Sequence, residues 1–141
     1  MADYKLVISD PKTGKSYQKE AKEPDSKSLS GLQIGDKVKG ETIDMAGYEF
    51  EITGGSDFAG FPMRKDVKGI LRKKILAVKG TGLAQKDKGI RVKKLVAGNT
   101  ISEKTAQINL KVIKYGKEPL EPKEEKAEEK KEPAEKAEET K

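Results

Sequence analysis

Cysteine, histidine and tryptophan are absent from this sequence, and it contains only seven aromatic residues. Without thiols and imidazoles, the chain lacks the usual soft metal ligands, disulfides, cysteine nucleophiles and histidine general bases. Its carboxylates show neither a metal-loop spacing nor an acid–base pair that could be placed in one cleft. The composition therefore argues against an enzyme, and predicts no catalytic residue, no metal site, no cofactor and no small-molecule substrate.

Long apolar runs are also missing. The longest is the four-residue run at 75–78, and the N-terminus has no basic region followed by an apolar stretch. These features predict neither a signal peptide nor a membrane span, so we expect a cytoplasmic protein without a membrane partner.

Charge is abundant but unevenly distributed along the 141 residues, whose formal net charge is +6. Residues 64–94 carry twelve basic and two acidic side chains, or +10, whereas the rest of the chain before residue 117 sums to −1. Such a block on a balanced body predicts binding to a polyanion, although a solvated face is the alternative. Interspersed glycines and scarce acids favour nucleic acid. The candidate RNA-binding residues are Arg64, Lys65, Lys68, Arg72, Lys73, Lys74, Lys79, Lys86, Lys88, Arg91, Lys93 and Lys94.

All seven aromatic residues lie outside residues 64–94. The basic segment therefore has no platform of its own on which single-stranded bases could stack. This favours contacts to the phosphates and 2′-hydroxyls of structured RNA, which is recognised by its shape.

Short alternating segments with glycine at their ends predict an all-β fold for residues 1–116, a small barrel-like body of short strands with glycine-rich turns. We expect a hairpin formed by residues 4–9 and 16–19, and further strands near 35–40, 48–53, 90–96 and 106–114. Residues 67–79 fit a helix or a strand. We favour a strand there, with residues 75–78 buried on both faces.

Residues 117–141 contain seven lysines, ten glutamates and three prolines, and their net charge is −3. This composition predicts a disordered, charged C-terminal tail. An acidic arm that folds back over the basic segment until RNA displaces it is the competing hypothesis.

The run from Gly54 to Arg64 is the most specific motif. We interpret it as a glycine-rich structural turn at Gly54, Gly55 and Gly60 that leads into the basic segment. It resembles a signature of the S-six-e family of small-subunit ribosomal proteins. The similarity extends in the same order to residues 5–15, 98–102 and 107–112, and so covers about residues 5–114.

This resemblance implies a structural constituent of the small ribosomal subunit, with ribosomal RNA and neighbouring ribosomal proteins as partners. The basic stretch is less arginine-rich than in most members, and the acidic tail lacks the serine cluster of the longer eukaryotic proteins, so the chain looks like the archaeal form. Two alternatives remain open: an RNA-binding or RNA-chaperone barrel acting outside the ribosome, and a protein–protein adaptor that uses the Phe58/Phe61 loop.

Overall fold

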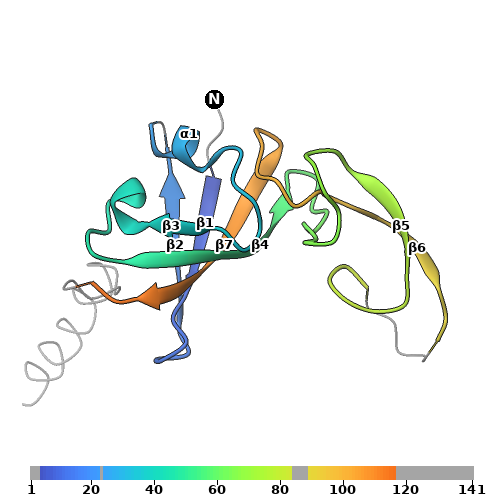
Figure 1. Cartoon of the computed structure of the whole chain (residues 1–141), viewed down its shortest axis with the longest axis horizontal. Coiled ribbons are helices and arrows are strands. Elements are labelled where there is room, and N and C mark those ends of the chain that lie inside the picture. The colour runs from blue at the N-terminus through green and yellow to red at the C-terminus, as the bar shows by residue number, and fades with distance from the viewer. Residues whose placement is uncertain (1–3, 23, 84–88, 117–141) are drawn as a thin grey trace, which may run out of the picture.

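A computed structural model describes residues 4–22, 24–83 and 89–116 (Figure 1). In this part of the chain, no helix is both long and apolar enough to cross a membrane. The elements, in chain order, are β1 (Tyr4–Ser9), β2 (Ser16–Ala21), α1 (Asp25–Leu29), β3 (Lys37–Lys39), η1 (Gly40–Ile43), β4 (Glu49–Asp57), β5 (Lys73–Ala77), β6 (Val92–Val96) and β7 (Thr105–Lys114).

Five strands form one sheet in the order β2-β1-β7-β4-β3. The β1–β7 pair is parallel, and the other three pairs are antiparallel. The prediction of a mostly β protein is confirmed, but the expected barrel is wrong. The sheet is open, because β2 and β3 do not pair with each other within the described residues, and β5 and β6 form a separate two-stranded sheet.

One face of the five-stranded sheet carries the hydrophobic core. Alternate residues of β1, β4 and β7 point to this face, where α1, η1 and their flanking loops cover it. These helical elements and loops cover the core, which further strands would enclose in a barrel. The side chains of this core that are no more than 1% exposed are Tyr4, Leu6, Ile8, Leu29, Ile43, Phe50, Ile52, Ile101, Ile108 and Leu110.

The two short helical elements were not predicted from the sequence. Helix α1 has five residues and buries only Ser26 and Leu29, so no apolar periodicity identifies it. The 3₁₀ turn η1 ends at Asp44, whose φ of 53° is left-handed and stops the turn.

Strands β5 and β6 form an antiparallel hairpin that projects from the sheet (Figure 1). The strand prediction for residues 67–79 is confirmed at Lys73–Ala77. Burial of residues 75–78 on both faces is wrong, because Leu76 is 56% exposed. The physical reason is that a two-stranded ribbon has too few neighbours to enclose both of its faces.

The glycine-rich run differs in part from the expected turn. Gly54 and Gly55 lie inside β4, beside a register shift between Ile52 and Gly54. A Cβ at position 55 would lie 2.3 Å from the Gln107 carbonyl oxygen, so the close approach of β7 explains this glycine. Gly60 does lie in a turn and has a φ of +80°.

Candidate nucleic-acid interface

The β5–β6 register distributes the hairpin lysines over two faces. Lys73, opposite Val96, and Lys94, opposite Ile75, lie on one face, which we call the Lys73 face. Lys74, opposite Leu95, and Lys93, opposite Leu76, lie on the other, the Lys74 face. All four lysines are exposed. Because residues opposite each other share a face, each face alternates cations with apolar side chains.

The remaining predicted cations lie around this hairpin. Lys65 and Lys68 are exposed in the segment that leads into β5. Lys79 and Arg91 are exposed just beyond the strand ends. Lys86 and Lys88 lie outside the described residues. The fold thus gathers the described exposed cations of the basic segment on the hairpin and at its base.

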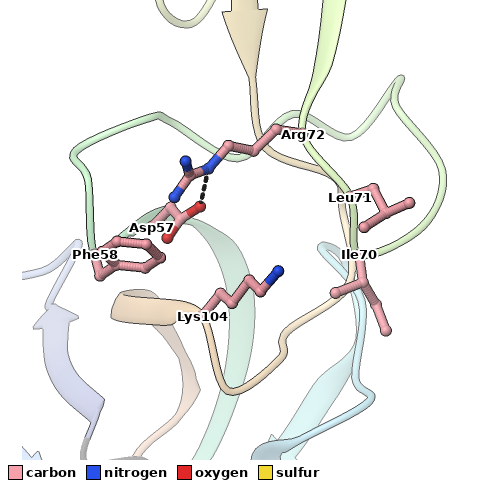
Figure 2. A pocket seen from close by; sticks show the side chains of 6 residues that line it. All are labelled: Asp57, Phe58, Ile70, Leu71, Arg72 and Lys104. Carbon is pink, nitrogen blue, oxygen red and sulfur yellow. Dashed lines mark hydrogen bonds and ion pairs between the residues drawn. The ribbon is translucent and has the colours of Figure 1, made fainter.

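Arg72 has a structural contact that sequence reasoning missed. Its Nε donates a hydrogen bond of 2.5 Å to Oδ2 of Asp57, at the end of β4 (Figure 2). Its guanidinium also lies 4.8 Å from the ring centroid of Phe58 and 5.0 Å from that of Phe61. Arg72 therefore anchors the base of the hairpin to the glycine-rich end of β4.

Both members of this pair are held in their charged forms. Burial alone would raise the pKa of Asp57, which is 6% exposed. The hydrogen bond from Arg72 and the positive charge of its guanidinium outweigh that effect and lower the pKa below its usual value. The bond to Asp57 correspondingly raises the pKa of Arg72. The contact is thus a charge-assisted hydrogen bond.

Arg64 is also engaged within the protein. Its Nη2 lies 2.7 Å from Oδ2 of Asp66, and its Nη1 donates to the Thr81 carbonyl at 3.4 Å. Only 13% of its side chain is exposed. Arg64 therefore links the entrance of the basic segment to the loop that follows β5.

The Gly98-Asn99-Thr100 block joins the hairpin to the sheet. A Cβ at position 98 would lie 1.7 Å from the carbonyl oxygen of Gly69, so only glycine fits. Asn99 is buried, and its Oδ1 accepts hydrogen bonds from the backbone N–H of Gly69 and from the Thr100 hydroxyl, both at 3.1 Å. Its Nδ2 donates to Gln33 at 3.3 Å. This block has a structural role at the hairpin base.

Exposed apolar side chains gather on the same part of the molecule. Phe58, Ile70 and Leu71 are 69%, 51% and 66% exposed, and they line a cavity of about 330 Å³ together with Asp57, Arg72 and Lys104 (Figure 2). No cluster of acidic side chains able to hold a metal ion occurs among the described residues. Grouped exposed apolar surface is typical of a contact region. Phe58 belongs to the loop named above for a protein–protein adaptor, whereas Ile70 and Leu71 lie in the basic segment and were not predicted to form a contact region.

Comparison with known proteins assigns the family. The family model for ribosomal protein S6e matches residues 4–124. The small ribosomal subunit protein eS6 of Nanoarchaeum equitans is 52% identical over 117 residues, which cover 83% of this chain and 86% of the relative. Its counterpart from Archaeoglobus fulgidus is 47% identical over 120 residues, which cover 84% and 93%. The chain belongs to the S6e family of ribosomal proteins, which are structural components rather than enzymes.

Proposed function

We propose that this protein is a structural constituent of the small ribosomal subunit that binds ribosomal RNA through residues 64–94. The eS6 relatives named above support the assignment of the protein to the small ribosomal subunit. The observation that carries the RNA-binding proposal is that the described part of the basic segment forms a projecting hairpin and its base, with all four hairpin lysines exposed.

The proposed mechanism is charge neutralisation. Exposed ammonium groups on β5 and β6 contact phosphates of neighbouring RNA helices and hold those helices together. Arg91, which is exposed, offers a guanidinium that can form a bidentate contact with a phosphate. Arg64 and Arg72 contribute mainly by fixing the hairpin on the sheet, because their guanidinium groups already have partners in the protein.

We also propose a division of the chain into an RNA-binding body, residues 1–116, and a tail, residues 117–141, that does not bind RNA. The negative net charge of the tail supports this division. Deleting residues 117–141 should leave the affinity for RNA unchanged. A higher affinity would instead support the hypothesis of an acidic arm that covers the basic segment, and a lower affinity would contradict a tail that does not bind RNA.

Co-sedimentation tests the proposed function. Tagged protein is added to salt-washed archaeal small subunits that have lost their own S6e protein, and the mixture is sedimented at increasing salt. We expect the protein in the small-subunit peak at low salt and its release as salt rises, because phosphate contacts weaken as salt increases. Absence from that peak at low salt would overturn the proposal.

A further inference from the structure

The two faces of the hairpin differ in what covers them. On the Lys73 face, the loop after β5 turns back against β6: a Cβ at Gly82 would lie 3.7 Å from Cγ1 of Val96 and 2.8 Å from Cγ of Pro62. Val96 is consequently only 1% exposed. The other apolar residues of this face, Ile75, Ala77 and Val92, are half-buried. The Lys73 face is therefore partly covered by the protein, although the side chains of Lys73 and Lys94 are exposed.

Polar contacts hold that arrangement in place. Nη1 of Arg64 donates to the Thr81 carbonyl, and a Cβ at Gly80 would lie 3.4 Å from the same nitrogen. At the start of β5, Nζ of Lys73 donates to the Lys68 carbonyl at 3.2 Å. One of the two lysines of the Lys73 face is thus already used to close the base of the hairpin.

The Lys74 face is more open, because Leu76 is exposed there, although Leu95 is half-buried. Leu76 is 56% exposed and lies opposite Lys93, while Lys74 lies opposite Leu95. In the described part of the chain, no carboxylate lies within ion-pair distance of Lys74 or Lys93. An apolar side chain that lies between two unpaired cations and is more than half exposed within the described residues indicates a binding surface.

We infer that RNA contacts the hairpin through the Lys74 face, with Lys74 and Lys93 on phosphates and Leu76 against the ribose between them, while the Lys73 face is structural. This inference rests on the proposed function and specifies its contact surface. The sugar–phosphate backbone is the occupant that fits, because two cations flank the leucine and the basic segment has no aromatic platform for bases. A protein partner would need acidic groups at the same two positions, and is an outcome of the test.

Two matched double variants test the inference. Lys74→Ala/Lys93→Ala and Lys73→Ala/Lys94→Ala each remove two positive charges from the same two strands. Binding to purified archaeal small-subunit ribosomal RNA is measured over a range of salt concentrations. The first variant should lose affinity by about tenfold or more near physiological salt, and its salt slope should fall by about 1.5, because two phosphate contacts are lost. The second should change affinity by less than about threefold.

A second pair of variants tests Leu76 independently of the lysines. Leu76→Glu should weaken RNA binding by about tenfold or more, since it places a negative charge against the backbone. Ile113→Glu is the control, because Ile113 is also exposed, at 38%, but lies on β7 of the sheet. Amide NMR spectra check that all four variants are folded.

The outcomes distinguish a failure of this inference from a failure of the proposed function. Equal losses from the two lysine pairs, or a larger loss from the Lys73 face, would overturn the assignment of the face while the proposed function stands. A parent protein that does not bind the RNA at all, at any salt concentration, would overturn both. Normal RNA binding by Leu76→Glu would also overturn the inference. If Lys74→Ala/Lys93→Ala bound RNA normally as well, the Lys74 face would be left for a protein partner.

Discussion

The five-stranded sheet and the β5–β6 hairpin both contain short strands with apolar side chains, but they differ in how far those side chains are buried. In the sheet, Phe50 and Leu110 are fully buried under α1, η1 and the loops. In the hairpin, Leu76 is more than half exposed, and Ile70 and Leu71 at its base are also exposed. Because apolar burial is the main stabilising force in folding, the sheet accounts for the stability of the fold, and the exposed hairpin is the part suited to binding.

The connection between the two regions is polar and specific. The Asp57–Arg72 ion pair, the stacking of Arg72 on Phe58 and Phe61, and the hydrogen bonds of Asn99 all lie at the hairpin base. These contacts fix the orientation of a ribbon that is too small to be stable alone. The basic surface is therefore presented by a rigid support.

The largest expected effect is on the core of the sheet. Phe50→Ala should lower the free energy of unfolding by about 3–5 kcal/mol, because it leaves a cavity at a fully buried site. Leu76→Ala, in the hairpin, should change it by no more than about 0.5–1 kcal/mol. Urea denaturation measures both. Equal losses would contradict the difference that we draw between the two regions.

The junction between the regions should be the next most sensitive. Gly98→Ala should cost about 1–3 kcal/mol, because the new Cβ would overlap the Gly69 carbonyl oxygen. Gly54→Ala is the control, since a Cβ there has no neighbour within 4 Å. Denaturation gives the stabilities, and amide exchange at Val67 and Gly69 reports the local loosening. A Gly98→Ala protein as stable as Gly54→Ala would show that the loop does not require this close contact.

A smaller loss is expected from the ion pair. Asp57→Asn should cost about 1–2 kcal/mol, because it leaves Arg72 with a weaker acceptor in a partly buried site. Glu49→Gln, which breaks the exposed pair with Lys114, should cost measurably less, because solvent screens that pair. The Asp57 variant should also show faster amide exchange in β5. If exchange in β5 did not change, Arg72 would not anchor the hairpin.

The smallest expected effect is on the pH dependence of the free energy of unfolding. The Tyr115 hydroxyl, 2.6 Å from Oδ1 of Asp10, is the largest cause of a lowered Asp10 pKa, and hydrogen bonds from Lys12 and Thr13 add to it against the opposing effect of burial. A lowered pKa gives stability that is present above the unfolded value, about 3.9, and is lost as the pH falls through the folded value. Tyr115→Phe should therefore show a smaller loss of stability between about pH 5 and pH 2. An unchanged pH dependence would contradict this role of Tyr115.

Much of the fold could be predicted from the sequence, because the relevant information is local. Alternation in residues 4–9 and 106–114, and the Asp10–Gly14 turn, predict β1, β2 and β7 correctly. Closure of the sheet could not be predicted, because it depends on which distant strands pair and on the small helical elements that cover the core. Helix α1 has only Leu29 as an apolar anchor, too little for a periodic signal.

The candidate site could also be predicted only in part from the sequence. Charge counting could identify the basic segment, since charge is a property of the sequence itself. It could not assign separate roles within that segment. Whether a cation is free or already paired depends on tertiary contacts such as Arg72 with Asp57, fifteen residues away, and Arg64 with the Thr81 carbonyl.

The most direct test compares the salt dependence of RNA binding for two variants that each replace four exposed lysines by alanine. One variant changes the hairpin at Lys73, Lys74, Lys93 and Lys94, and the other changes the sheet at Lys5, Lys37, Lys39 and Lys111. We expect the hairpin variant to lose about 1.5 or more from its salt slope and at least about tenfold in affinity for small-subunit ribosomal RNA, while the sheet variant resembles the parent. Equal losses from both variants, or a larger loss from the sheet variant, would contradict RNA binding through the hairpin.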